Sequence, residues 1–162
     1  FLDASAEDVE GMGMLNTIAL TSLTRQFVPG MVERGRGGVL NVGSVASFVP
    51  APRFAVYAAT KAYVLSLTDA LHYELADTGV HVSCLCPGPV RTSFADRAGM
   101  DDQFFSGAMS AERVVNAGLN GLARNRRRVV PGLINKAQAI ASSWVPSGIT
   151  LRVTKAVMRR AG

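Results

Sequence analysis

The sequence lacks any long uninterrupted run of apolar residues. A helix that crosses a bilayer needs roughly 20 such residues, so we expect no transmembrane helix. The first residues, Phe-Leu-Asp-Ala-Ser, also lack the basic start that a signal peptide has. Hydrophobic residues nevertheless make up 48% of the chain, which excludes a disordered chain and predicts one folded domain.

Cysteine is scarce as well, with Cys84 and Cys86 alone among 162 residues. They stand two apart on an apolar segment, and on a strand this spacing points both thiols to one face and suits a mutual disulfide poorly. We expect free core thiols in a reducing, cytoplasmic compartment. Neither histidine stands at ligand spacing from the cysteines, and we expect no metal site.

Acidic residues are absent from residues 113–162, although this part holds ten of the 17 Lys and Arg residues. All twelve Asp and Glu residues lie in residues 1–112, so the net charge of +5 conceals a basic tail behind an acidic body. We expect no nucleic-acid partner, because Trp144 is the only aromatic residue in the tail that is available for base stacking. Anionic lipid and an acidic protein are the remaining partners for such a tail.

Two long helices are predicted. The first spans about residues 6–28, behind the capping-box pattern of residues 5–8, with apolar residues at near-helical spacing until Pro29-Gly30. The second, about residues 53–76, is apolar around most of its circumference, which indicates cover on both sides. We expect these two helices to form the interface of a homodimer or homotetramer.

Short apolar segments alternate with the helices. They predict strands at residues 39–43, 80–86 and 128–130, with a further helix at residues 111–123. Such alternation indicates parallel strands joined by crossovers, in an α/β sheet covered on both faces. Ligands of such sheets bind beyond the carboxyl ends of the strands, where Ser44 and Pro87-Gly88 fall.

Tyr57 and Lys61 are spaced one helical turn apart, and Ser44 precedes the tyrosine by thirteen residues. Residues i and i+4 share a helix face, so the ammonium is carried beside the phenol. A nearby ammonium makes a phenol more acidic, and a phenol paired with a hydroxyl can polarise a carbonyl and transfer its proton. This pattern favours a hydride-transfer enzyme, because its members converge from separate segments on one edge of the sheet.

Up to about Gly132, the chain resembles the C-terminal half of a short-chain dehydrogenase/reductase. Four segments carry the resemblance: residues 15–21 (LNTIALT), 38–44 (GVLNVGS), 57–62 (YAATKA) and 87–92 (PGPVRT). The resemblance implies an α/β fold of the Rossmann-like, doubly wound type, here with only its later strands and helices. The expected domains are residues 1–132, the later part of an NAD(P)-binding catalytic domain, and residues 133–162, a basic extension.

The resemblance also implies roles for single residues. Tyr57 would be the general acid/base, Ser44 would hold the substrate oxygen, Lys61 would bind the nicotinamide ribose, and Asn16 would belong to a proton relay. The residues implied to contact NAD or NADP are Tyr57, Lys61, Pro87, Gly88, Val90 and Thr92. Taken alone, Pro87-Gly88 is also typical of a strand-ending turn, and Asn16 of a solvated or helix-bending amide.

The family's phosphate-binding motif, Gly-x-x-x-Gly-x-Gly, has no counterpart in this sequence. We therefore expect a part of a longer chain, in which the edge of the first strand is exposed and activity belongs to the intact parent. The leading interpretation is an NAD(P)-dependent oxidoreductase that interconverts a secondary alcohol and a ketone. A catalytically silent binding or regulatory module and a carrier-protein-linked ketoacyl reductase remain as alternatives.

The loop after the second strand carries apolar residues that are expected to face a small apolar alcohol or ketone: Phe94, Met100, Phe104, Phe105 and Met109. After Pro146, apolar and basic residues alternate at helical spacing, which predicts a basic amphipathic helix. This helix either packs on its own domain, the preferred interpretation, or makes a peripheral membrane contact. The arginine-rich run of residues 124–128 is expected to be a solvated helix end.

Overall fold

A computed structural model describes residues 1, 4–91, 108–142, 144–145, 148–149 and 151–152. Its main sheet has three strands in the order β1 (Gly37–Val42), β2 (Val80–Leu85), β5 (Arg128–Val129). Two further short strands, β3 (Val90–Arg91) and β4 (Met109–Ser110), pair with each other. All pairs are parallel, and the register of the first pair runs from Gly37 opposite Val80 to Val42 opposite Leu85.

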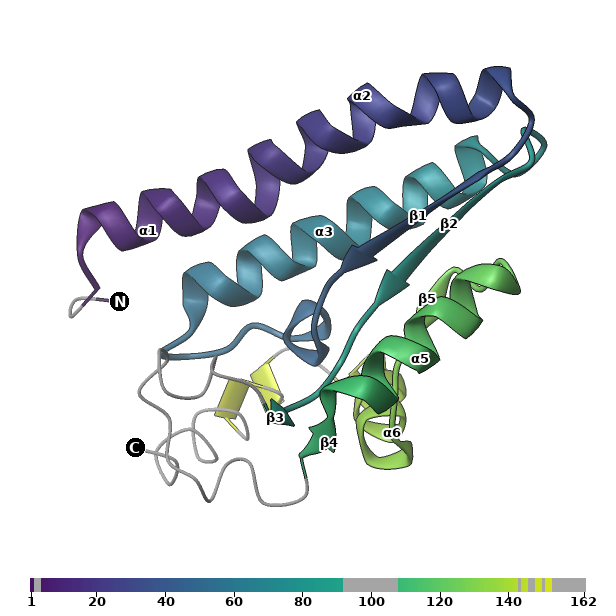
Figure 1. The fold of residues 1–162 in the computed structure, drawn as a ribbon. Helices are drawn as coiled ribbons and strands as arrows, with labels where there is room; N and C mark the ends of the chain where they lie inside the picture. The colour runs from purple at the N-terminus through teal and green to yellow at the C-terminus, as the bar shows by residue number, and fades with distance from the viewer. Residues whose placement is uncertain (2–3, 92–107, 143, 146–147, 150, 153–162) are drawn as a thin grey trace.

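Helices cover both faces of the main sheet (Figure 1). One face carries a long helix, built from α1 (Ala6–Gly13), η1 (Met14–Ala19) and α2 (Leu20–Glu33), beside α3 (Ala55–Glu74). The other face carries α5 (Ala111–Ala123), and α6 (Leu133–Ser142) follows β5. The expected α/β class is confirmed: these are the later strands and helices of a Rossmann-like sheet.

The long first helix does not end at Pro29-Gly30, as the sequence pattern predicts, but continues to Glu33. Its end is a Schellman motif, in which Gly35 has a φ of 64° and donates its N–H to Val32 O at 2.9 Å. Arg36 N donates to Met31 O at 3.1 Å in the same motif. Proline removes one N–H but tolerates helical φ, so the glycine that adopts positive φ decides where the helix stops.

The core lies between α3 and β2. Val64 and Leu65 of α3 pack there with Cys84 and Cys86, and the two sulfur atoms lie 3.6 Å apart as free thiols. The hydrogen bond with Cys84, together with burial, raises the pKa of the Cys86 thiol. Buried thiols with this property behave as small hydrophobic side chains rather than as nucleophiles.

Within the described part of the chain, no helix combines the length and the apolar character that crossing a membrane requires.

Candidate active site

The carboxyl ends of β1 and β2 lie side by side, as the sequence predicts. Gly43 N donates to Leu85 O at 2.8 Å, and Val45 N donates to Pro87 O at 2.9 Å. These hydrogen bonds continue the parallel pairing beyond the ends of the two strands. They place Ser44 next to the segment that leads from β2 to Pro87. The first two strands therefore end in one shared edge.

Ser44 stands at the start of the short helix η2 (Val45–Phe48) and is buried. Its Oγ accepts a hydrogen bond from Ala46 N at 3.1 Å, and its backbone N donates to Ser47 Oγ at 3.0 Å. Because that Oγ is occupied only as an acceptor among the described contacts, the hydroxyl proton of Ser44 is available to an incoming oxygen atom.

Ser47 connects this turn to α3. Its Oγ donates to the backbone carbonyl of Lys61 at 2.8 Å while it accepts from Ser44 N. The serine turn and the helix that carries the tyrosine are therefore held together by one buried hydroxyl. Sequence reasoning did not identify Ser47, and the only signal is its i+3 spacing from Ser44, which matches a capping interaction.

Lys61 reaches from α3 to the end of β1. Its Nζ donates to Val42 O at 2.9 Å and lies 5.8 Å from the centroid of the Tyr57 ring. Burial lowers the pKa of the Lys61 ammonium, and this effect outweighs the nearby Cys84 and Cys86. One N–H is used at Val42, and an ammonium has three, so two donors remain for a ligand hydroxyl.

Tyr57 lies in the first turn of α3 and is half-buried. Its backbone carbonyl accepts a hydrogen bond from Thr60 Oγ1 at 2.8 Å, and Thr60 Oγ1 accepts from Asn16 Nδ2 at 3.1 Å. Asn16 is thereby brought to the turn of α3 that carries Tyr57 and Lys61. The structure gathers Ser44, Tyr57, Lys61 and Asn16 around one end of the sheet, although they come from three separate segments.

Asn16 belongs to η1, a stretch of π-helix inside the long first helix. Such stretches are rare and occur often at functional sites. Threonine hydroxyls accompany it, with Thr17 Oγ1 donating to Gly13 O at 2.5 Å and Thr21 Oγ1 donating to Thr17 O at 2.7 Å. Apolar periodicity gave no sign of this π-helix, because one widened turn hardly changes the spacing of the apolar residues.

The sequence pattern of the family described as short chain dehydrogenase matches residues 1–103. The chain belongs to the short-chain dehydrogenase family. It is 40% identical over 89 residues to human dehydrogenase/reductase SDR family member 4, covering 55% of this chain and 32% of the relative. It is 30% identical over 131 residues to the ketoacyl reductase HetN of Nostoc sp., covering 80% of this chain and 46% of that protein.

A solved short-chain dehydrogenase from Sphingobium yanoikuyae, in complex with NADPH, is similar to this chain with a TM-score of 0.78 and 34% identity. The match covers 88% of this chain and 57% of that structure. The chain spans about a third to a half of the length of the curated relatives above. The family assignment from residues 15–92 is therefore confirmed.

Among the residues that this family implies as cofactor contacts, Pro87 and Gly88 follow β2 at the shared edge. A Cβ atom on Gly88 would lie 2.4 Å from Asn135 Oδ1, so the Asn135 side chain of α6 occupies the space beside this glycine. Val90 lies in β3, where it pairs with Met109. Thr92 and the loop residues Phe94, Met100, Phe104 and Phe105 lie outside the described residues.

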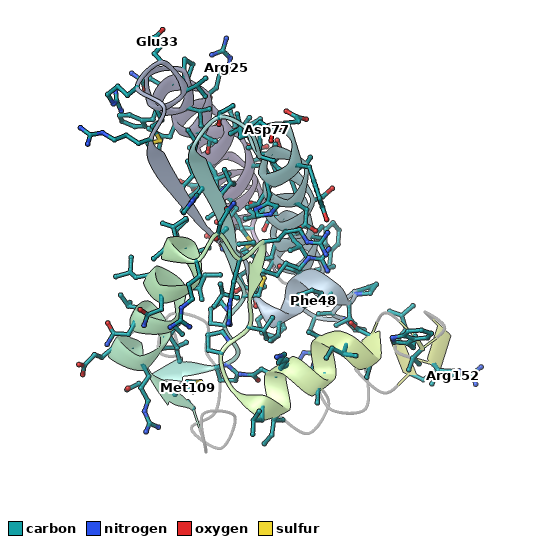
Figure 2. The ribbon with its side chains drawn as sticks, turned by 90° about the vertical axis from the view of Figure 1, so that its right-hand side faces the viewer. Arg25, Glu33, Phe48, Asp77, Met109 and Arg152 are labelled. Atoms are coloured by element: carbon teal, nitrogen blue, oxygen red, sulfur yellow. The ribbon has the colours of Figure 1, made fainter. Side chains whose placement is uncertain are left out.

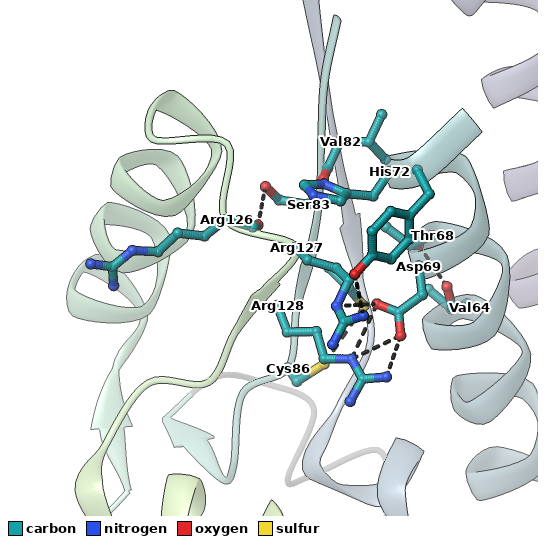
Figure 3. A network of polar contacts seen from close by, with 12 residues as sticks. Val64, Thr68, Asp69, His72, Val82, Ser83, Cys86, Arg126, Arg127 and Arg128 are labelled. Carbon is teal, nitrogen blue, oxygen red and sulfur yellow. Dashed lines mark hydrogen bonds and ion pairs between the residues drawn. The ribbon is translucent and has the colours of Figure 1, made fainter. Parts of the chain in front are cut away.

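The arginine-rich run is a solvated helix end only in part: Arg124 caps α5, and Arg124 and Arg126 are exposed, but Arg127 and Arg128 are not free in solvent. Helix α5 ends at Ala123, and the two last arginines turn back to α3, where both pair with Asp69 (Figure 3). Arg128 donates to both carboxylate oxygens of Asp69, with Nε 3.1 Å from Oδ1 and 2.8 Å from Oδ2, and this hydrogen bonding to Asp69 raises the pKa of the arginine. Arg127 Nη1 also donates to Tyr73 Oη at 3.1 Å. These contacts fasten β5 to α3 and so support the edge of the sheet.

An apolar cavity of about 520 Å³ lies against the first turns of α3. Its lining includes Phe48, Ala58, Ala62 and Leu151, the last from the C-terminal extension. Of the predicted basic helix, only residues 148–149 and 151–152 are described, and all four are helical. The remaining basic residues of that prediction lie outside the described part.

Proposed function

We propose that this chain carries the catalytic half of an NAD(P)-dependent oxidoreductase that interconverts a secondary alcohol and a ketone. The observation that carries the proposal is the position of the Lys61 ammonium. It is bonded to the end of β1 and lies 5.8 Å from the Tyr57 ring, at the edge where Ser44 is held. In this proposal the Tyr57 phenol is the proton donor, the Lys61 ammonium is its electrostatic partner, and Ser44 provides the hydroxyl beside them.

In this proposal Ser44 donates its hydroxyl proton in a hydrogen bond to the substrate oxygen and fixes its position. Tyr57 gives its proton to that oxygen in reduction and takes one from the alcohol in oxidation. Lys61 stabilises the phenolate electrostatically, because an ammonium favours the charged form of a neighbouring acid. General acid/base catalysis of this kind contributes about a hundredfold or more to a rate.

The residues present fit the nicotinamide end of NAD(P). Lys61 has two ammonium donors left for ribose hydroxyls, and the strand ends at Gly43 and Pro87 bring backbone close to the same edge. When bound, the cofactor would supply the hydride in reduction and accept it in oxidation. No residue in the described part of the chain favours NAD over NADP, although the similar structure from Sphingobium yanoikuyae is in complex with NADPH.

Asn16 is proposed to act in a relay that returns protons to Tyr57. The support is its hydrogen bond to Thr60, which precedes Lys61 on α3, and its place in the π-helix. Asn16 would position this relay and would not touch the substrate.

A ketoacyl substrate is the second candidate. It is favoured by the similarity to the ketoacyl reductase of Nostoc sp., which covers 80% of this chain, and the same residues would serve that reaction. The third interpretation, a silent binding module, is supported only by the lack of the glycine motif. A small apolar substrate is supported by the alanine-rich cavity beside α3.

The proposal includes a homodimer or homotetramer through the long first helix and α3. Its support is a set of exposed apolar residues on the long first helix: Met14, Leu15, Ile18, Leu23 and Phe27. The free thiols are consistent with the proposed cytoplasmic compartment. Leu151 in the cavity beside α3 supports a tail that packs on its own domain, and the division at residue 132 stays a prediction.

Turnover of apolar ketones and 3-ketoacyl compounds, measured in the complete enzyme by loss of reduced nicotinamide absorbance, tests the function. The Tyr57→Phe variant should lose at least about a hundredfold in turnover. Tyr63→Phe is the matched control, because it removes a phenol from the same helix whose Oη bonds Thr21 at 2.8 Å, outside the site. Near-normal turnover of Tyr57→Phe would contradict the proposal.

A further inference from the structure

Helix α6 presents an apolar face to solvent. Leu133 is 87% exposed, Ile134 85% and Trp144, two residues beyond the helix, 84%. Ile140 is exposed as well, and with Ala137 and Ala141 these residues recur at positions i, i+1, i+4, i+7, i+8 and i+11. Residues at this spacing form one continuous stripe, which we call the α6 stripe.

The opposite face of α6 is fixed to the domain. Ala139 is buried, and the side chain of Asn135 donates to Pro131 O at 2.8 Å and lies where a side chain on Gly88 would be. Asn135, Ala139 and Ser142 are spaced i, i+4 and i+7, so the small and polar residues face inward. The helix is therefore held with its large apolar side chains outward.

The surroundings of the α6 stripe carry positive charge. Lys136 is exposed on the flank of the stripe, and Arg152 lies in the helical segment that follows. Residues 113–162 contain ten Lys and Arg residues and no acidic residue. An apolar stripe flanked by lysine and ended by tryptophan matches a helix that lies in the surface of an anionic membrane.

Two other occupants fit less well. A second copy that met this face through a twofold contact would bring two acid-free segments together, and their like charges would repel. A preceding strand that pairs with the free edge of β1 would add to the far side of the sheet, because the order is β1-β2-β5 and α6 follows β5. Figure 2 shows α6 at the end of the molecule opposite Glu33.

We propose that the α6 stripe binds the surface of an anionic lipid membrane, with Trp144 at the boundary between headgroups and acyl chains. This inference does not depend on the proposed reaction. It places the membrane contact on α6, whereas the sequence pattern offered such a contact only as the alternative for the helix after Pro146.

Trp144 is the only tryptophan in residues 1–162, so a protein of these residues reports on this surface through its fluorescence. With vesicles of phosphatidylcholine and roughly 30% phosphatidylserine, the Trp144 emission should shift to shorter wavelength and the protein should co-sediment with the vesicles. With vesicles of phosphatidylcholine alone, both effects should be much smaller. Unchanged emission and no pelleting with the anionic vesicles would overturn the proposal, as would equal binding to both kinds of vesicle.

Leu133→Gln/Ile134→Gln keeps the fluorophore and the charge, and should lower partition into anionic vesicles at least about tenfold. Val115→Gln/Leu119→Gln on α5 is the matched control, since these side chains are 51% and 52% exposed elsewhere, and it should bind as the parent does. Lys136→Gln should lower binding roughly fivefold, and only with anionic vesicles. Unchanged vesicle binding by the α6 double variant would refute the proposal. The proposal would also be refuted if the parent protein did not bind vesicles and the α6 double variant dissociated an oligomer that the parent forms.

Discussion

Lys61 donates its ammonium hydrogen bond to the carbonyl oxygen of Val42 at 2.9 Å, across the junction between α3 and β1. The bond fixes the cation at the edge where the strands end. The bond also uses the carbonyl of Val42, the last residue of β1. Val42 is paired with Leu85 in β2, and the carbonyl of Leu85 accepts a hydrogen bond from Gly43 N. The position of the cation is therefore fixed by its hydrogen bond to the sheet.

Ser47→Ala is expected to destabilise the domain and to disturb Ser44. The hydroxyl accepts from Ser44 N and donates to Lys61 O, so its loss leaves two buried backbone groups without these partners. The free energy of unfolding should fall by about 1–3 kcal/mol, measured by urea denaturation. Turnover of the complete enzyme should fall as well, because the serine turn loses its link to α3.

Ser66→Ala on the exposed side of α3 is the control for Ser47→Ala and should leave both quantities unchanged. If the unfolding free energy of Ser47→Ala equalled that of the parent within error, the hydrogen bonds of Ser47 to Ser44 and Lys61 would not stabilise the domain.

The lowered pKa of Lys61 predicts a specific pH dependence. Burial lowers this pKa below the ordinary value of 10.5, so just below 10.5 the unfolded chain binds more protons at this site than the folded chain. Stability from this group therefore rises with pH through that window. Lys61→Met lacks the titrating group, and the unfolding free energy of the parent minus that of the variant should increase from about pH 7 to about pH 10.

Urea unfolding at several pH values measures this difference directly. Groups remote from Lys61 contribute equally to both proteins and cancel in this difference. A difference that is flat or declines with rising pH would mean that Lys61 is not desolvated.

The sequence predicted the sheet and the members of the site for physical reasons. Short apolar runs ended by glycine or proline mark buried parallel strands, and the i, i+4 spacing of Tyr57 and Lys61 requires only a helix to bring them together. Ser44 and Pro87 meet because the carboxyl ends of paired parallel strands share one edge. Local spacing and topology predicted that Ser44, Tyr57 and Lys61 lie together, whereas Asn16 was implied only by the family resemblance.

What the sequence did not predict depends on contacts between distant segments. The ion pair of Asp69 with Arg128 joins residues 59 positions apart, and a run of arginines at a helix end looks like a solvated face without its partner. The passage of the helix through Pro29 depends on a turn at Gly35. The outward stripe of α6 reverses the usual inward direction of apolar residues, and periodicity alone does not tell which face is outside.

Asp69→Asn is expected to loosen β5. The carboxylate is bound by Arg127 and Arg128, whose side chains are 40% and 37% exposed, while that of Asp69 is 16% exposed. Because water partly screens the arginines, the loss in unfolding free energy should be about 1–2 kcal/mol, more than for an exposed pair. Urea denaturation measures it, and the difference from the parent should shrink at high salt.

Asp77→Asn is the matched control for Asp69→Asn, since it removes an exposed carboxylate that follows the same helix. A loss of similar size in the two variants would show that the ion pair adds nothing beyond net charge.

Gly88→Ala is expected to push the Asn135 side chain of α6 away from its hydrogen bond to Pro131 O, because the new Cβ would lie 2.4 Å from Asn135 Oδ1 and 2.6 Å from Asn135 Nδ2. Overpacking of this kind costs about 1–3 kcal/mol, seen as a lower unfolding free energy and faster hydrogen exchange in residues 133–142. Asn135→Ala shortens the obstructing side chain, so the Gly88→Ala/Asn135→Ala variant should recover stability relative to Gly88→Ala. The double-mutant cycle should then give a favourable coupling free energy between the two substitutions. If their effects on the unfolding free energy were strictly additive, the cost of Gly88→Ala would come from the backbone at position 88 and not from contact with Asn135.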